Sequence, residues 1–402
     1  MSTGVPRVAS AQGRAAAPSP GERGASYDGT GPWRLLRHYG VAAAEGLALD
    51  EALMLGYRRG APFRPPTIRL YTYRSHAALV GRYQHLEAEI DLGACSRTGT
   101  GVNRRPTGGG AIVMGEGQLG VAVVAHAPAA ETPKQLLGRF SEGIIAGLAT
   151  IGVRACFRGK NDLETAGKKI AGLGLYLDGK GALLFHSSVL ADLDLAFMLE
   201  VLRVPAAKLG DKGVAAVRER VTTVTAETGA DWSGRDLCGA VAAGFATALG
   251  TELLPGDVEG EESEAARTLV SDKYESETWL HQRTPHPDAN GSSLFKTPAG
   301  LVRVYVALSG ATIKSALFAG DFNEIPEPLG RFEESLRWKR LDASELASLA
   351  ERTTSGDTGL GVPPEALARA VLEAGERALA HAAAAPVRLE GSCYFPEKEP
   401  SP

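Results

Sequence analysis

The feature that most constrains this chain is a glycine-rich stretch over residues 102–128, which contains the run RRPTGGGA at residues 104–111. Three consecutive glycines let the backbone take a positive φ and let another group approach without meeting a Cβ. The surrounding pattern predicts a strand, a tight loop and then a hairpin of strands. Successive N–H groups in such a loop can bind an anion, and Arg105 can add a charged hydrogen bond. Taken alone, a flexible turn with solvated arginines is the plainer interpretation of the loop.

Composition and short motifs exclude several classes of protein. The loop has neither a following GK[ST] nor a GxGxxG spacing, so it is not a Walker A loop or a dinucleotide fingerprint. A formal net charge of -4 disfavours a general nucleic-acid binder, and no stretch has the roughly 18 uninterrupted apolar residues of a membrane span. The four cysteines lack CxxC spacing, which argues against structural zinc and against a disulfide scaffold. We therefore expect a cytoplasmic monomer with no membrane or nucleic-acid partner.

Helix and strand patterns alternate along roughly the first 250 residues. Apolar residues at helical spacing predict helices over residues 41–60 and 135–152. This alternation, with turns of glycine and aspartate, is typical of an α+β fold with a mostly antiparallel sheet. Branched and aromatic residues predict the strands over residues 65–74, 77–84, 153–159, 162–179 and 182–192.

Changes in composition along the chain predict five segments. Residues 1–30 have almost no large apolar side chain and are expected to be a disordered tail, although their arginines leave a mitochondrial presequence as an alternative. Residues 31–255 are expected to form the larger α+β domain, and residues 256–290 a charged linker. Residues 291–385 combine a hairpin of two or three strands with helices in a small α+β domain, and residues 386–402 form an irregular tail.

Two further clusters have the residue types that chemistry needs. Asparagine and aspartate at residues 161–162 are followed by GKKIAG at residues 167–172. A lysine on such a strand can point into a cavity and bind an anion there, but strand alternation turns Lys168 and Lys169 to opposite faces. At most one of them then points inward, and a solvated pair beside a turn is the plainer interpretation. His186 lies in an apolar strand, as either a satisfied core histidine or part of a pocket wall.

In their order and spacing these segments resemble the lipoate–protein ligase family, within the biotin and lipoate ligase superfamily. RRPTGGGAI resembles the family's RRxxGGGAV signature, GKNDLETAGKKIAG resembles GRNDL…GKKISG, and FHSSVLADLDL resembles HHGTLLLDVDL. KYESETWLHQRTPH and GLVRVYVALSGATIKSALFAGDF resemble the linker and accessory domain of two-domain ligases. The resemblance implies a biotin/lipoate-ligase-like fold, with a mixed, mostly antiparallel sheet flanked by helices and a small α+β C-terminal domain.

The resemblance also implies an ATP-dependent ligase that works in two steps. A lipoate or octanoate carboxylate attacks the α-phosphorus of ATP, with Mg as cofactor, and gives an acyl-adenylate. A lysine of a lipoyl-carrier protein then attacks the acyl group, and AMP leaves. The implied carrier is a dehydrogenase E2 domain, a glycine-cleavage H protein or a specialised lipoate-binding protein.

Motif positions assign the site residues that the resemblance implies. Lys169 is the expected catalytic cation between two anions, and Asp162 is the expected Mg ligand. The contacts to ATP and the acyl-adenylate are expected at Arg105, Gly108, Gly109, Gly110, Ala111, Ile112, Val113, Asn161, Asp162 and Lys169. The lipoate pocket is expected at Arg82, Met114, Gly172 and His186.

Departures from the family pattern leave two alternatives open. Met114-Gly115 replaces the family's His-Asp pair, so Met114 is expected to shape the acyl pocket, and a non-catalytic lipoate-binding relative is one alternative. The other is a cysteine-dependent octanoyl or lipoyl transferase of the same superfamily, which needs no ATP. Its nucleophile would lie just before Asn161. Cys156 is close, but the aligned position falls on Phe157, and we expect the inward side of this strand to be core.

Overall fold

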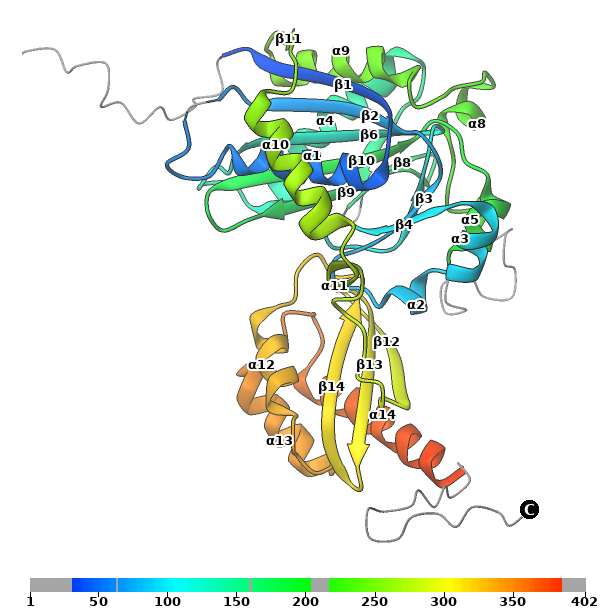
Figure 1. Cartoon of the computed structure of the whole chain (residues 1–402), viewed down its shortest axis with the longest axis vertical. Coiled ribbons are helices and arrows are strands. Elements are labelled where there is room, and N and C mark those ends of the chain that lie inside the picture. The colour runs from blue at the N-terminus through cyan, green and yellow to red at the C-terminus, as the bar shows by residue number, and fades with distance from the viewer. Residues whose placement is uncertain (1–30, 63, 159–160, 204–216, 385–402) are drawn as a thin grey trace, which may run out of the picture.

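The computed structural model describes residues 31–62, 64–158, 161–203 and 217–384. Figure 1 shows a larger α+β part and, at its lower end, a smaller part built from one sheet and helices, which we call the accessory part (residues 291–384). The tails expected over residues 1–30 and 386–402 lie outside the described residues. None of the helices in the described ranges is both long enough and apolar enough to cross a membrane.

An eight-stranded sheet forms the centre of the larger part. β1 runs parallel to β11 and to β2, and every other neighbouring pair is antiparallel. The predicted α+β class, with a mixed and mostly antiparallel sheet, is therefore confirmed. The strands lie in the order β11 (Leu253–Pro255), β1 (Trp33–Val41), β2 (Thr67–Tyr73), β6 (Gln118–His126), β10 (Ala182–Leu190), β9 (Lys168–Leu177), β8 (Asp162–Thr165) and β7 (Cys156–Arg158).

Side-chain alternation gives this sheet a core on each face. Val121 and Val123 of β6 contact one core, which the helices α4 (Pro133–Thr150) and α9 (Leu237–Leu249) cover. Ala122 and Val124 contact the opposite core, which α1 (Ala43–Leu55) covers. The cavity of the candidate site lies on the α1 face, because its apolar wall belongs to the same core as α1.

The glycine-rich stretch does not fold as the predicted hairpin. β5 (Ile112–Met114) pairs with β3 (Ala77–Val80), which also pairs with β4 (Gly101–Arg104), in a separate three-stranded sheet. After the turn at residues 115–117, β6 joins the large sheet between β2 and β10. A turn with two glycines therefore carries the chain from one sheet to the other, although its short length suggested two paired strands.

After β3 the chain forms two short helices, α2 (Leu86–Glu89) and α3 (Leu92–Thr98). Asp91 begins the second one, because its carboxylate accepts a hydrogen bond from Ala94 N at 2.8 Å. Gly99 ends it with a left-handed φ of 67°. Two further short helices of the larger part lie within the described ranges, α5 (Leu195–Val201) and α8 (Val224–Thr228).

The accessory part is a three-stranded antiparallel sheet with helices packed on it. β13 (Gly300–Ser309) pairs with β12 (Gly291–Thr297) and with β14 (Thr312–Gly320), so the predicted hairpin of two or three strands has three. Val302, Val304 and Val306 alternate on one face of β13 and lie in the core beneath the helices. Those helices are α12 (Glu327–Ser335), α13 (Ala343–Thr354) and α14 (Pro364–Ala384).

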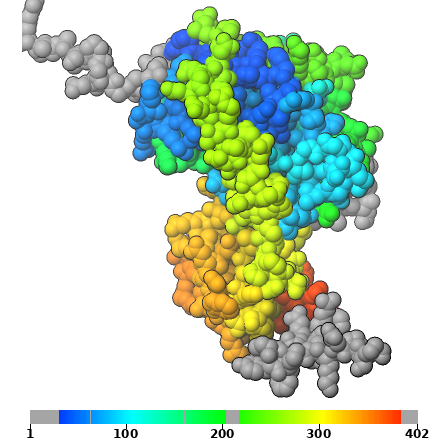
Figure 2. Space-filling model, in the orientation of Figure 1, coloured from blue at the N-terminus to red at the C-terminus, as the bar shows by residue number. Residues whose placement is uncertain are grey.

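The segment expected to be a linker is folded against the larger part. It contains α10 (Gly260–Leu269), the π-helical turn η2 (Val270–Tyr274) and α11 (Glu277–Leu280). Figure 2 shows it as a yellow-green band that runs along the surface from the larger part to the accessory part. The helical portion of this segment is therefore part of the folded structure.

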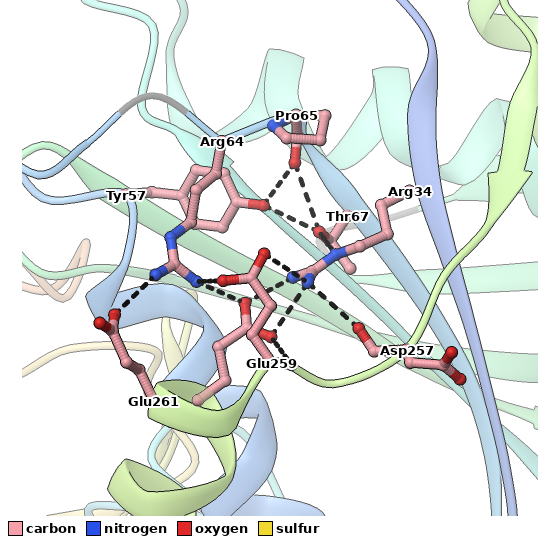
Figure 3. A network of polar contacts seen from close by, with 9 residues as sticks. Arg34, Tyr57, Arg64, Pro65, Thr67, Asp257, Glu259 and Glu261 are labelled. Atoms are coloured by element: carbon pink, nitrogen blue, oxygen red, sulfur yellow. Dashed lines mark hydrogen bonds and ion pairs between the residues drawn. The ribbon is translucent and has the colours of Figure 1, made fainter.

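Two arginines of the larger part hold α10 in place. Glu262 is buried and accepts hydrogen bonds from Arg34 Nη2 at 2.6 Å and from Arg64 Nη1 at 2.9 Å. Figure 3 shows the same arginines beside Glu259 and Glu261, with which they form further ion pairs. Charged residues in this segment thus have partners on the larger part, which the sequence pattern did not reveal.

Candidate functional site

A cavity of about 510 Å³ lies where the large sheet, the glycine loop (residues 105–111) and the accessory part meet. One side of it is apolar and the other is polar, as expected of a pocket that binds a chain with a reactive end. Its apolar wall is formed by Leu47, Tyr71, Tyr73, Leu79, Ile112 and Met114. Its polar wall includes Arg105, Gly108, Gly109, Gly110, Asn161, Asp162, Lys169, His186, Ser188, Lys296 and Asp321.

A β-bulge turns Lys169 toward this cavity. Leu163 of β8 lies opposite Ala171 of β9, whereas the next residue, Glu164, lies opposite Lys169, so Ile170 is left without a partner. Ile170 and Ala171 both lie in the core beneath the sheet. Lys169 therefore points to the cavity face, opposite to the side chain of Ala171. In a regular strand, two residues that are two positions apart would point to the same face.

The Lys169 side chain is held in place at its charged end. Its Nζ forms an ion pair with Asp162 Oδ1 at 2.6 Å. Gly172 lies opposite Asp162, and a Cβ at Gly172 would be 3.3 Å from Lys169 Nζ, so the glycine leaves room for the ammonium. Lys168 pairs with Thr165 and is not among the lining residues.

Arg105 supports the glycine loop from beneath. Its buried Nη2 donates hydrogen bonds to Gly108 O and to Gly110 O, both at 2.7 Å, and its Nη1 donates to Leu79 O at 3.2 Å. Burial lowers the pKa of this guanidinium to about 10. Gly109 has a φ of 88°, a conformation that favours glycine. Arg105 thus fixes the shape of the loop with most of its hydrogen-bonding capacity.

The accessory part packs directly against the glycine loop. Gly109 N donates a hydrogen bond to Phe322 O at 3.3 Å. A Cβ at Gly108 would lie 2.2 Å from Phe322 O and 2.5 Å from Asn323 Cα, so no side chain fits there. One N–H of the expected phosphate-binding loop is therefore used in a contact between the two parts.

His186 forms part of the cavity wall as a partly buried, neutral side chain. Its Nε2 lies 2.7 Å from Thr107 Oγ1, at hydrogen-bond distance, at the start of the glycine loop. Gly174 lies opposite it on β9, where a Cβ would be 2.3 Å from His186 Nε2. Burial, and then the charge of Arg105, lower the pKa of His186 to about 3. This histidine therefore positions the loop and carries no charge at neutral pH.

Two of the expected site residues lie outside the cavity wall. The Arg82 guanidinium stacks over the rings of Tyr83 and Tyr176, with centroid distances of 5.6 and 5.4 Å, instead of lining the pocket. Val113 is buried in a small core beneath the three-stranded sheet. Its neighbours Ala111, Ile112 and Met114 do line the cavity, together with Gly172.

The donor set at Asp162 does not fit a magnesium site. The Asp162 carboxylate is engaged by the Lys169 ammonium, which would compete with a cation for the same oxygen. The described ranges also contain no group of three or more histidine, cysteine or acidic residues that could hold a metal ion. Carboxylate-rich coordination, which Mg²⁺ prefers, is therefore not provided by the described residues at the place the sequence suggested.

Cys156 is an exposed free thiol on the sheet face that bears Lys169, and it lies outside the set of residues that line the cavity. It lies opposite Glu164, which itself lies opposite Lys169. Phe157 is the residue of β7 that packs against the core. Phe157, the position expected to align with the transferase nucleophile, thus faces the core, whereas Cys156 faces away from it. The apolar Phe157 between two polar neighbours is the signal that identifies the correct faces.

Comparison with known proteins supports a transferase. Residues 42–246 match the family profile described as Lipoyl protein ligase A/B catalytic domain. Octanoyltransferase LipM of Symbiobacterium thermophilum is 31% identical over 61% of this chain and 97% of its own length. Octanoyltransferase LipM of Kyrpidia tusciae is 32% identical over 62% of this chain and 99% of its own length. Lipoate-protein ligase A subunit 1 of Thermoplasma acidophilum is 30% identical over 58% of this chain and 90% of its own length.

Solved structures agree with the fold. The bipartite lipoate protein ligase of Thermoplasma acidophilum, studied with its E2 lipoyl domain, has a TM-score of 0.57 at 28% identity and covers 64% of this chain and 99% of its own. Plasmodium falciparum LipL1 in complex with lipoate has a TM-score of 0.62 and covers 80% of this chain and 94% of its own. Its identity is 16%, so this likeness concerns the fold alone.

These relatives overturn the expected reaction. Six of the similar proteins are named octanoyltransferases, from six different bacteria. The expectation of an ATP-dependent ligase, drawn from the RRxxGGGAV and GKKISG likeness, is therefore wrong, because both branches of the superfamily share these segments. The transferase alternative fits the names of the relatives better.

Proposed function

This chain belongs to the family of lipoyl protein ligase A/B catalytic domains, as its sequence resemblance predicted, and we propose that it is a cysteine-dependent octanoyltransferase. It is an enzyme of the lipoate ligase and transferase family, and its chemistry is the modification of proteins by lipoylation. The proposed reaction moves an octanoyl group from a carrier-protein thioester to the side-chain amine of a lysine on a lipoyl domain. ATP and Mg have no part in this reaction.

The observation that carries the proposal is the position of Cys156. Its thiol is exposed on the face that bears Lys169, two strands away, which corresponds to roughly 10 Å between the two Cα atoms. Lys169 extends toward β7, because its ammonium reaches Asp162 on the intervening strand. Asp162 is a diagonal cross-strand neighbour of Cys156, at roughly 7–8 Å between Cα atoms. This geometry leaves the Lys169 ammonium on the side of the sheet where the thiol lies, within reach of an acyl group bound between them.

The chemistry follows from these two groups. The Cys156 thiolate attacks the thioester carbonyl, a new C–S bond forms, and the donor thiolate leaves and takes up the thiol's proton. Lys169 stabilises the negative charge on the sulfur and on the tetrahedral oxyanion. A neutral amine of the acceptor lysine then attacks the acyl-enzyme, an amide bond forms as the C–S bond breaks, and the proton that the amine loses passes to the departing sulfur, which regenerates the Cys156 thiol. The contact between Lys169 and the reacting atoms is expected to tighten when the donor is bound.

The apolar wall suits the acyl chain. Leu47, Leu79, Ile112 and Met114 provide a dry surface along which an eight-carbon chain can lie. Met114 stands where the family usually has a histidine, and its flexible thioether suits an unbranched chain. Such a slot also keeps water from the thioester, which protects it from hydrolysis.

A lipoyl domain is the proposed acceptor. The Thermoplasma ligase with which this fold agrees was studied together with its E2 lipoyl domain, which supports an acceptor of this kind. An E2 domain and a glycine-cleavage H protein both carry the required lysine. We retain the cytoplasm and a monomeric state as parts of the proposal.

The test is an intact-mass measurement after incubation with an octanoyl-carrier thioester and no ATP. We expect one octanoyl group on the wild-type protein and none on the variant Cys156→Ser. Cys238→Ala is the matched control, since Cys238 is a free cysteine buried against the core, and it should keep the adduct. An adduct that persists in Cys156→Ser, or transfer that occurs only with ATP, contradicts the proposal. Binding of the acyl group without transfer would instead indicate a non-catalytic relative.

A further inference from the structure

We propose that Lys296 of the accessory part binds the phosphate of the acyl donor's phosphopantetheine arm and is a specificity-determining residue for that donor. The inference rests on the proposed transferase function. It gives the accessory part a role in choosing the substrate.

The accessory part is an addition to a chain of transferase size. The LipM relatives match over 97–99% of their own length but over 61–62% of this chain. Octanoyl transfer in those relatives therefore proceeds without most of the remaining residues. A role of the accessory part in the reaction is therefore expected where it contacts the cavity.

The accessory part forms one wall of the catalytic cavity. The turn between β12 and β13 contributes Lys296 to Gly300, and the end of β14 contributes Asp321. Polar contacts fix this wall on the larger part: Gln84 Nε2 donates to Asp321 Oδ1 at 3.0 Å, and Arg303 forms an ion pair with Glu89 at 3.1 Å. The buried Gln84 side chain also accepts from Gly81 N, so it is fixed at both ends. The turn therefore has a defined place at the mouth of the site.

Charge in the cavity points to an anionic ligand group. The lining residues include three cationic side chains and two carboxylates, a formal surplus of one positive charge. Lys169 is paired with Asp162, and Arg105 is held by backbone carbonyls. Lys296 is exposed, and no carboxylate of the described residues forms an ion pair with it. The accessory part itself contributes one cation and one carboxylate, Lys296 and Asp321, and the charge of Asp321 acts on Arg105. Among the described residues that line the cavity, Lys296 is therefore the cation whose charge is left for a ligand.

The octanoyl thioester itself is neutral, so it cannot use this charge. The nearest anion on the donor is the phosphate of the phosphopantetheine arm, which carries one negative charge as a phosphodiester on a carrier protein. A lysine ammonium is a common binder of such a phosphate, as a point charge with three donors. Lys296 therefore recognises the donor by its arm, while the apolar wall recognises the acyl chain.

Three octanoyl donors distinguish recognition of the phosphopantetheine arm from recognition of the acyl chain. Octanoyl-carrier protein and octanoyl-coenzyme A have a phosphate on the arm, and octanoyl-N-acetylcysteamine has none. Lys296→Gln is expected to lower kcat/KM for the first two donors about tenfold relative to the third, mainly through KM. Lys296→Arg should restore most of the loss, because it keeps the charge. An effect with coenzyme A but not with the carrier protein would name coenzyme A as the source of the phosphate.

Lys314→Gln is the matched control. Lys314 lies on β14, is ion-paired with Asp288 and is not among the residues lining the cavity, so the substitution removes the same charge from the same sheet. It should leave the ratio of the three donors unchanged. An equal loss for all three donors in Lys296→Gln, or no loss, overturns the proposal.

A binding measurement keeps the inference separate from the proposed function. Calorimetric titration with phosphopantetheine and with pantetheine requires no turnover. Wild-type protein should bind the phosphorylated compound about tenfold more tightly, and Lys296→Gln should bind the two compounds alike. Equal binding by the wild type contradicts the role of Lys296 whether or not octanoyl transfer is observed. Absence of transfer with any donor contradicts the transferase function alone.

Discussion

Lys169 Nζ and Asp162 Oδ1 form an ion pair of 2.6 Å in the polar wall of the cavity, one strand away from the thiol of Cys156. Both side chains are about one third exposed, so the pair adds little to the free energy of unfolding. The ion pair instead fixes the position of the Lys169 ammonium. The carboxylate holds the ammonium over β8, on the side of the sheet edge where the nucleophile lies.

Lys169→Ala is expected to lower the rate of octanoyl transfer by about 10²–10³-fold, because it removes the cation that stabilises the thiolate and the oxyanion. The melting temperature should change little. Lys168→Ala is the matched control, since Lys168 pairs with Thr165 and does not line the cavity. Single-turnover transfer to a lipoyl domain measures both variants. Equal losses would show that Lys169 has no special place at the site.

Gly108→Ala is expected to weaken the contact between the accessory part and the glycine loop. The added Cβ would lie 2.2 Å from Phe322 O, so the backbone of the accessory part must move. We expect a loss of about 1–3 kcal/mol in the free energy of unfolding, measured by denaturant titration. Gly110→Ala is the control, because its Cβ would meet nothing closer than 4.0 Å. If the two variants are equally stable, the contact does not exist in solution.

The regular parts of the fold were predictable from the sequence, and the irregular parts were not. Nearly continuous apolar runs in β6 and β10 identify buried strands directly, and the glycine loop stands out by composition. The sequence does not show that β5 and β6 belong to different sheets, because partner choice depends on contacts distant in the chain. The bulge at Ile170 is likewise invisible, since either residue of a bulge can continue an alternating pattern.

Only part of the candidate site could be predicted, because local motifs are visible in the sequence and contacts between distant segments are not. Lys169, the glycine loop and His186 follow from motifs within single segments, and they line one cavity. The accessory wall with Lys296 was missed, because no local pattern shows where a second domain packs. The sequence left the role of Cys156 open, because the position aligned with the transferase nucleophile fell on its neighbour Phe157. The reaction itself was wrong because ligases and transferases of this superfamily share the motifs on which it was based.

Burial of His186 makes the stability of the protein depend on pH. Its pKa is lowered to about 3 in the folded protein, from about 6.5 in an unfolded chain. Between these values the unfolded state binds one more proton, so the free energy of unfolding falls as the pH falls, by about 1.4 kcal/mol per pH unit. His186→Gln removes this titration and should show a correspondingly shallower loss between pH 6.5 and about 4. Urea titrations at several pH values measure the slopes; parallel slopes for the two proteins would mean that His186 is solvated.

Glu262→Gln is expected to destabilise the larger part by about 2 kcal/mol, because Arg34 and Arg64 lose the carboxylate that they share in a largely buried place. Burial by itself raises the pKa of Glu262. The hydrogen bonds from Arg34 and from Glu259 N, together with the charge of Arg64, outweigh that effect, so the pKa is lowered overall. The ion pairs therefore stabilise the fold above the pKa of an unfolded glutamate, near 4.3, and this contribution is lost as the pH falls through the lower folded value.

Glu261→Gln is the matched control, since the Glu261 side chain is 88% exposed and its substitution should cost under about 0.5 kcal/mol. Thermal unfolding of both variants at pH 7 and below pH 4 tests this expectation. The two variants should differ at pH 7 and converge in acid, and a difference that persists in acid would assign the loss to packing instead of charge.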